Sequence, residues 1–190
     1  MKNINKIKKA LEVRIKRYHE DFSLCLMAEQ WEEVLYRTLK DIGLSPKWDN
    51  DRSHKVGEDI FENSIGRISC KSGAIEGKKK DKVKFSGSRT GSYKLLKEKL
   101  EFLSSSHDDF YFLLAKDKKD INKKNFKYKV LIFSSTSCKV DRLNWEKTKG
   151  GWKGNGSFEA TIHNSMSGQL WTTLPLNMID HIIDINGNPS

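Results

Sequence analysis

The sequence predicts an α/β fold in which a central mixed β-sheet is flanked by helices. Two stretches with apolar residues every three or four positions occupy the first quarter of the chain, and strand-like runs with one further helix follow. The order helix, helix, β-hairpin, strand, helix, strand, strand is typical of an α/β fold with a mixed sheet. A chain of 190 residues can bury a sizeable core, so we expect a single domain over 1–190.

Two helices are expected at the start of the chain. Residues 4–20 form a basic helix, and residues 24–42 form a second helix that stops at Gly43, a residue type favoured just after a helix. The second helix has one apolar stripe, which consists of Trp31, Val34, Leu35, Leu39 and Ile42.

The remaining elements are expected to be mostly strands. A hairpin over 58–62 and 66–72, with its turn at Asn63 and Ser64, is followed by a strand at 82–86 and a helix at 92–103. Further strands are expected at 110–115 and 128–135, and in the runs FEATI and QLWTTL. The run TKGGWKGNGSF is expected to be a flexible loop, and LNMIDHII a short helix.

The charge balance points to a polyanionic partner. Lys and Arg number 35 against 25 Asp and Glu, which gives a net charge of +10, and nucleic acid is the common polyanion of the cytosol. A lysine-rich coding bias is the alternative explanation. The cysteines and histidines are scattered without zinc-site spacing, and no apolar run approaches the roughly 18 residues of a membrane span. We therefore expect a cytoplasmic protein that does not enter a membrane.

The run GEDIFENSIGRISCKSG, residues 57–73, carries the clearest chemical signal. Side chains alternate along a strand, so Ser69 and Lys71 share one face, with Asp59 opposite Ser69 and diagonally near Lys71. A carboxylate that holds Mg²⁺ and a lysine that orients water are what phosphodiester hydrolysis requires. An ordinary surface ion pair, worth about 0–1 kcal/mol, would produce the same pattern.

Glu32 is the second candidate acid. It falls at the edge of the apolar stripe of the second helix, from which a carboxylate can project into a site. The alternative is a half-exposed glutamate paired with a nearby lysine.

The helix WEEVLYRTLKDIG followed by EDIFENSIGRISCKSG resembles the PD-(D/E)XK nuclease superfamily, which includes most type II restriction endonucleases. The resemblance implies a restriction-endonuclease-like core over about 24–135, with recognition or dimer elements at 1–22 and 136–190. In that family a helix glutamate, a strand aspartate and a (D/E)xK motif form the metal site. The matching positions are Glu32, Asp59 and the run from Ser69 to Lys71.

Ser69 departs from the family pattern, because it occupies the position of the second carboxylate. Some family members bring the missing carboxylate from the following helix, where Glu98 is the first candidate and Glu101 the next. Glu58 and Glu76 are further candidates. Lysines at i−4 would pair with both helix glutamates, so simple surface ion pairing also explains them.

Two segments could contact DNA. The run SGSRTGSYK and the lysine-rich run before it place Lys84, Ser88, Arg89 and Thr90 where they could bind phosphate or a guanine edge. The same loop could simply begin the next helix. Within 145–172, Asn164 and Gln169 are candidates for reading adenine, unless this region is a hairpin with packed tryptophans.

The sequence thus favours a Mg²⁺-dependent type II restriction endonuclease of double-stranded DNA. A palindromic target requires two-fold symmetry and so short a chain supplies one active site, which predicts a homodimer. The resemblance also implies a companion DNA methyltransferase encoded separately. The alternatives are a non-catalytic basic module that binds DNA or RNA, and a structure-specific repair or phage-defence nuclease on the same fold.

Overall fold

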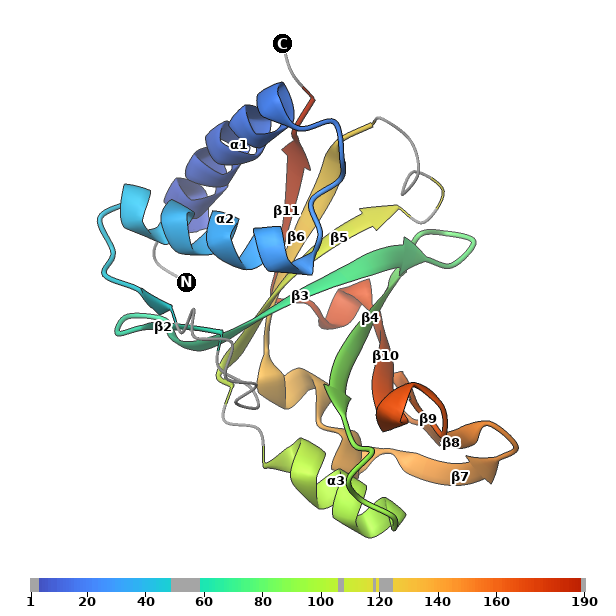
Figure 1. The fold of residues 1–190 in the computed structure, drawn as a ribbon. Helices are drawn as coiled ribbons and strands as arrows, with labels where there is room; N and C mark the ends of the chain where they lie inside the picture. Colours follow the sequence, from blue (N-terminus) through green and yellow to red (C-terminus); the bar gives the residue numbers. More distant parts are fainter. Residues whose placement is uncertain (1–3, 49–58, 106–107, 118, 120–124, 189–190) are drawn as a thin grey trace.

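The computed structural model describes residues 4–48, 59–105, 108–117, 119 and 125–188, which form a mixed α/β structure. Helices α1 (Ile4–Asp21) and α2 (Ala28–Asp41) lie on one side of the upper sheet in Figure 1, and α3 (Leu96–Ser104) lies at the lower end of the molecule. None of the described helices is both long enough and apolar enough to cross a membrane.

The strands of the described residues belong to one sheet with the order β11-β6-β5-β3-β4-β10-β9-β8-β7, with β2 on β3 and β1 on β2. β3 and β5 run parallel, and the other pairs are antiparallel. The strands are β1 (Lys47–Trp48), β2 (Ile60–Glu62), β3 (Gly66–Glu76), β4 (Lys82–Arg89), β5 (Phe110–Asp117), β6 (Lys127–Ser134), β7 (Asn144–Thr148), β8 (Gly151–Asn155), β9 (Glu159–His163), β10 (Gln169–Pro175) and β11 (His181–Asn186).

Strand β3 is forked along one edge. Its other edge pairs with β5 from Ile68 to Ile75. On the forked edge, β2 pairs with β3 only as far as Ile68, and β4 begins to pair at Gly73. Among the described strands, none pairs with residues 69–72 on this edge. Figure 1 shows β2 and β4 leaving β3 in different directions.

Two cores lie on opposite faces of the sheet. The first core joins α1 and α2 to strands β3, β5, β6 and β11, with Trp31 fully buried and its indole N–H donating to the Phe112 carbonyl at 3.0 Å. The second core joins β4, β9 and β10 to α3 and the short 3-10 helices η2 (Ser135–Cys138) and η3 (Val140–Arg142). Helices α1 and α2 therefore cover one face of the sheet at one end, and α3 with the 3-10 helices covers the opposite face at the other end.

Most expected elements are confirmed, with shifted ends. The second helix begins at Ala28 and the third at Leu96, while β3 and β4 extend past their predicted ends to Glu76 and Arg89. The mixed sheet flanked by helices is confirmed as well.

Two predictions near the C-terminus are wrong. LNMIDHII contains only a 3-10 turn at Leu176–Met178 and then enters β11, where Ile183 and Ile185 are buried against the first core while Ile182 is 42% exposed. This alternation fits a strand, and β6 supplies its partner. The supposed loop TKGGWKGNGSF forms most of the β7–β8 hairpin. Gly151 permits the tight turn into β8, because it has φ 146° and a Cβ there would lie 1.9 Å from the Ile162 carbonyl oxygen.

Candidate active site

Asp59 occupies the forked edge of β3, next to β2. Its backbone N–H donates to the Ile68 carbonyl at 3.0 Å, so it continues the hairpin by one residue beyond Ile60. Its Oδ2 accepts the Cys70 backbone N–H at 2.5 Å and the Ser69 hydroxyl at 3.2 Å. The same oxygen lies 3.7 Å from the Lys71 Nζ. The predicted placement of Asp59 opposite Ser69 and diagonally near Lys71 is confirmed.

The fork explains why this carboxylate is held in place. The Cys70 N–H has no described strand to pair with on this edge, and a buried N–H without a partner is costly. The Asp59 carboxylate takes the place of the missing strand carbonyl. The side chains of Lys71 and Asp59 are 26% and 25% exposed, so both groups remain accessible to a ligand.

Glu32 of α2 belongs to the same charged group. Burial first, and then the negative charge of Asp59, raise the pKa of Glu32 from its usual 4.5 to about 7, against the opposing charge of Lys71. The Trp48 side chain donates a hydrogen bond to the Glu32 carboxylate. Glu32, Asp59 and Lys71 are thus close enough to influence one another, although α2, β2 and β3 are separate elements.

A small hollow opens beside Lys71 on the face of β3 that carries Ser69. Its volume is about 70 Å³, and its lining includes Ser69, Lys71, Ser88, Asp108 and Lys139. Ser69 is fully buried, and Asp108 is 6% exposed. The hollow therefore brings one residue of the predicted DNA-contact loop, Ser88, next to the candidate catalytic lysine.

The sequence did not indicate Asp108 or Trp48. Asp108 precedes β5, and Trp48 ends β1, so both approach the site through strand pairing and not through a local pattern. An acidic residue directly before an apolar strand, as in the run DDFYFLLA, was the one available signal for Asp108.

The structure does not bring the predicted helix carboxylates to the site. Glu98 accepts the backbone N–H groups of Lys94 and Leu95 at 3.1 Å and 3.0 Å, which satisfies the start of α3. The Glu101 Oε1 lies 3.9 Å from the Lys97 Nζ in an exposed ion pair. Figure 1 places α3 far from α2, at the opposite end of the molecule. Both glutamates are therefore engaged at α3 itself, although Leu103 and Ser104 of this helix line the hollow beside Lys71.

The other candidate carboxylates are also absent from this group. Glu76 ends β3 five residues beyond Lys71 and lines a different cavity, while Glu58 lies outside the described residues. In the parts of the chain that the structure describes, no three His, Cys, Asp or Glu side chains are arranged to hold a metal ion.

The predicted DNA-contact residues lie at several separate places on the sheet. Arg89 is exposed and lies directly opposite Gln169 on the β4–β10 pair, so these two candidates are neighbours. Asn164 is exposed in the turn after β9, where its backbone N–H donates to the Gly150 carbonyl at 2.8 Å. The Lys84 Nζ lies 5.5 Å from the centre of a Trp171 ring.

Thr90 has a structural role that contradicts its predicted contact with DNA. It is fully buried, and its hydroxyl donates to the Gly168 carbonyl at 2.7 Å. Its own carbonyl accepts the Lys99 Nζ at 2.8 Å. The alternative for 145–172 is supported in part, because Trp145 and Trp152 pack against the second core of this strand-rich region.

Comparisons with known proteins add no relative: no family model matches the chain, and no curated protein or solved structure matches it.

Proposed function

We propose that the chain is a Mg²⁺-dependent DNA endonuclease with a restriction-endonuclease-like core. The observation that carries the proposal is the Asp59 carboxylate, held by the Cys70 N–H at the unpaired edge of β3 and 3.7 Å from the Lys71 ammonium. Glu32 adds a second carboxyl group whose pKa responds to both. A carboxylate pair beside a lysine on an accessible edge suits the hydrolysis of a phosphodiester.

These side chains suit Mg²⁺ better than a metal ion whose ligands all come from the protein. Mg²⁺ keeps several water ligands and commonly takes one or two carboxylates together with substrate phosphate oxygens. Asp59 and Glu32 would supply those carboxylates. When bound, the ion would offset the negative charge that develops on the phosphate. The raised pKa of Glu32 indicates a carboxyl group that gains from a nearby cation.

The other residues of the site have positioning roles. Ser69 donates its hydroxyl to Asp59 and fixes the carboxylate, whereas Lys71 would orient the attacking water or contact the phosphate. Asp108, which lines the adjoining hollow, replaces Glu98 as the candidate for the missing acidic position. Each role is one that a separate substitution can test.

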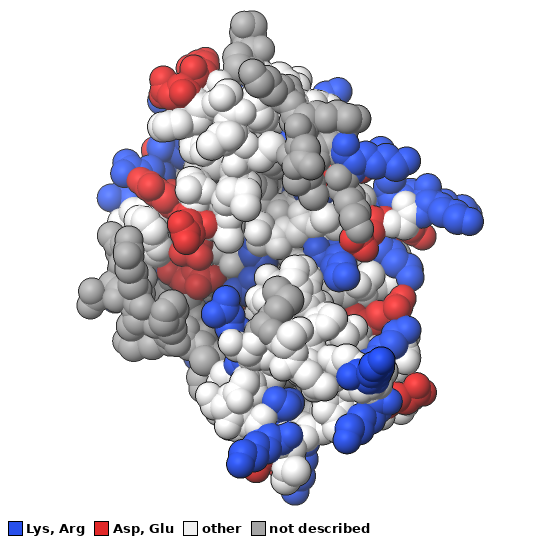
Figure 2. All heavy atoms as spheres, turned by 45° about the vertical axis from the view of Figure 1, so that its right-hand side comes forward, with Lys and Arg blue, Asp and Glu red and all other residues white. Residues whose placement is uncertain are grey.

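The DNA would lie along the unpaired edge of β3, next to Lys71. Figure 2 shows Lys and Arg side chains along the right-hand edge and over the lower half of the visible face, and a group of Asp and Glu side chains at its left. Arg89, paired with Gln169, is the strongest candidate for a base or phosphate contact, with Ser88 beside Lys71. Lysine contacts would make binding weaken steeply as salt increases.

The specific form that we propose is a type II restriction endonuclease of double-stranded DNA that acts as a homodimer. One site per chain requires two chains to cut both strands of a palindrome. A separately encoded methyltransferase would then protect the same target.

The decisive test is digestion of a long, unmethylated DNA by the purified protein in Mg²⁺ or in EDTA. Discrete fragments that require Mg²⁺ and disappear in Asp59→Ala and Lys71→Ala are expected. Asp109→Ala is the matched control, because Asp109 also accepts a backbone N–H of β3, that of Arg67 at 2.8 Å, but lies away from Lys71. Fragments that persist in both site variants would refute the assignment.

A serine in the acidic position favours one alternative, a basic module that binds DNA or RNA without cleaving it. Intact DNA under every condition, with a salt-sensitive gel shift that ignores Mg²⁺, would establish this alternative. A ladder without fixed cut positions would instead favour a structure-specific repair or phage-defence nuclease on the same fold.

A further inference from the structure

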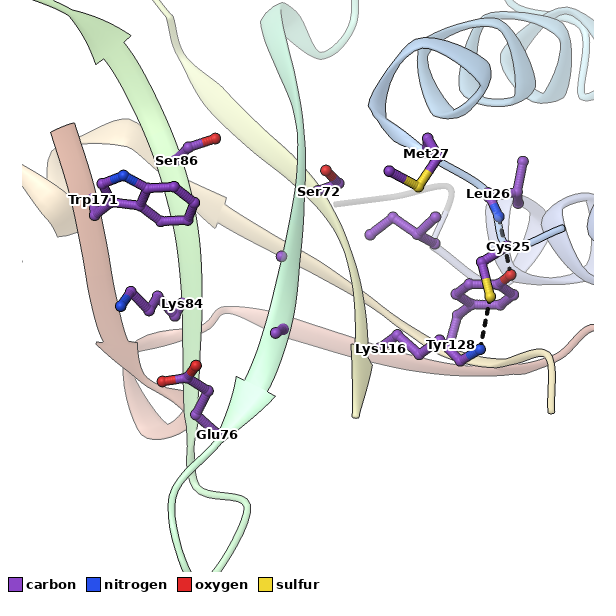
Figure 3. A pocket seen from close by; sticks show the side chains of 13 residues that line it. Cys25, Leu26, Met27, Ser72, Glu76, Lys84, Ser86, Lys116, Tyr128 and Trp171 are labelled. Atoms are coloured by element: carbon purple, nitrogen blue, oxygen red, sulfur yellow. Dashed lines mark hydrogen bonds between the residues drawn. The ribbon is translucent and has the colours of Figure 1, made fainter. Parts of the chain in front are cut away.

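A larger cavity lies on the opposite face of β3. Its volume is about 370 Å³, within the usual range for small-molecule sites. Ser72, Gly73 and Ala74 of β3 form its floor. Figure 3 shows Trp171 and Lys84 on one side of the cavity and Met27 and Tyr128 on the other.

The strand register creates this cavity. Trp171 lies opposite Ser86, and Lys84 lies opposite Ala74, so these side chains rise from one face of the sheet. The helical layer reaches the cavity only through the connection between α1 and α2, which contributes Met27. Gly73 lets β4 approach β3 closely at this point, because a Cβ there would lie 2.6 Å from the Lys84 carbonyl oxygen.

The walls combine an aromatic surface with positive charge. Trp171 is half-buried, and its indole projects towards the cavity in Figure 3. The Lys84 ammonium lies 5.5 Å from a ring centre of this indole. Lys116, which is 6% exposed, brings a second ammonium to the opposite wall, where it donates to the Cys25 Sγ at 2.8 Å, and Glu76 adds a carboxylate to the lining. A ligand that combines a flat ring with a negatively charged group would match both features.

The cavity adjoins the candidate active site through two elements. Ser72 of its floor is the neighbour of Lys71 on β3, and both belong to the stretch where the forked edge has no described strand partner. Met27, at the cavity, is the residue just before α2, and Glu32, at the site, lies in the second turn of that helix. The side chains of Lys71 and Ser72 point to opposite faces of β3, so a DNA strand with a phosphate at Lys71 would reach the cavity around the unpaired edge of β3.

We infer that the cavity receives a nucleobase that has left the stack of the bound DNA strand, with the base on Trp171 and its phosphate near Lys84. This inference rests on the proposed function, because it takes the strand at Lys71 to be DNA. Stacking on an indole tolerates every base, while the Ser72 and Ser86 hydroxyls can donate to or accept from the base edge. Extrusion of a base into a pocket beside the reacting phosphate would select DNA that unstacks easily.

The test uses the full chain in EDTA and a single-stranded thymidine oligonucleotide with one central 2-aminopurine. Binding to the native protein is expected to change the 2-aminopurine fluorescence. Trp171→Leu should weaken binding roughly 5- to 150-fold, the range for loss of one aromatic stacking contact. Ala74→Phe, which fills the floor and leaves the indole intact, should also weaken binding. Circular dichroism and thermal unfolding establish that each variant is folded.

Trp152→Leu is the matched control, because Trp152 packs against the second core from the opposite face of the sheet. It should bind the oligonucleotide like the native protein. Native affinity in both Trp171→Leu and Ala74→Phe, or no binding by the native protein, would overturn the inference. Cleavage in Mg²⁺ is measured separately. Fragments without base capture would support the nuclease proposal and overturn the base-binding inference. Base capture without cleavage would support the base-binding cavity and overturn the nuclease proposal.

Discussion

The raised pKa of Glu32 predicts a specific dependence of stability on pH. The pKa is about 7 in the folded protein against a usual value of 4.5, so between these two pH values the folded state holds a proton that the unfolded chain has released. The contribution of Glu32 to the free energy of unfolding therefore falls as the pH rises from about 4.5 to about 7. Glu32→Gln removes the ionisable group, and with it this part of the pH dependence.

The size of the effect follows from the pKa and the exposure. A rise from 4.5 to about 7 corresponds to at most about 3.4 kcal/mol at 1.36 kcal/mol per pH unit. Glu32 is only half-buried, so solvent screening reduces this ceiling to about 1–2 kcal/mol. For a chain of this length, such a change shifts the melting temperature by roughly 2–8 °C.

Urea unfolding at about pH 5 and about pH 8 measures this difference. The native protein should lose about 1–2 kcal/mol more than Glu32→Gln between the two conditions. Glu33→Gln is the matched control, because the Glu33 side chain is 46% exposed on the same helix and pairs with Arg37. Equal pH dependence in the native protein and Glu32→Gln would refute the argument. Mg²⁺ at about pH 8 should raise the stability of the native protein more than that of Glu32→Gln, since binding to the folded state stabilises it.

Three further substitutions separate structural residues from site residues. Tyr128→Phe should lower the free energy of unfolding by about 1–3 kcal/mol in urea, because its buried hydroxyl accepts the Leu26 N–H at 3.2 Å and bonds His19 at 3.0 Å; an unchanged midpoint would contradict this. Glu98→Ala should lower the free energy of unfolding by about 0.5–2 kcal/mol, because it removes the hydrogen bonds at the start of α3. It should leave the cleavage rate unaltered, and a loss of cleavage in the folded variant would return Glu98 to the site. Asp108→Asn should strongly reduce Mg²⁺-dependent cleavage while preserving the circular dichroism spectrum, and a native rate would remove Asp108 from the proposed acidic position.

Tertiary pairing explains the failed sequence predictions. The residues of LNMIDHII can satisfy either a helix or a strand, and β6, about fifty residues earlier, provides the edge that makes the strand favourable. Thr90 belongs to a polar run that is typical of an exposed loop. It is buried because the turn at Gly168, distant in sequence, folds over it.

The sequence by itself determined the local geometry of the candidate site. Side chains alternate along a strand and the turn position sets the register, so the positions of Asp59, Ser69 and Lys71 relative to one another were already implied by their spacing. The apolar stripe of α2 likewise fixed which side of that helix is buried and left Glu32 at its edge.

Only the tertiary structure decided which distant groups join that hairpin. The fork of β3 leaves the Cys70 N–H for Asp59 to bind, and it depends on where β4 begins to pair. The approach of Asp108 and the removal of Glu98 to the far end of the molecule follow from how whole elements pack. Backbone periodicity acts over a few residues, whereas burial and strand pairing join segments whose separation along the chain carries no local signal.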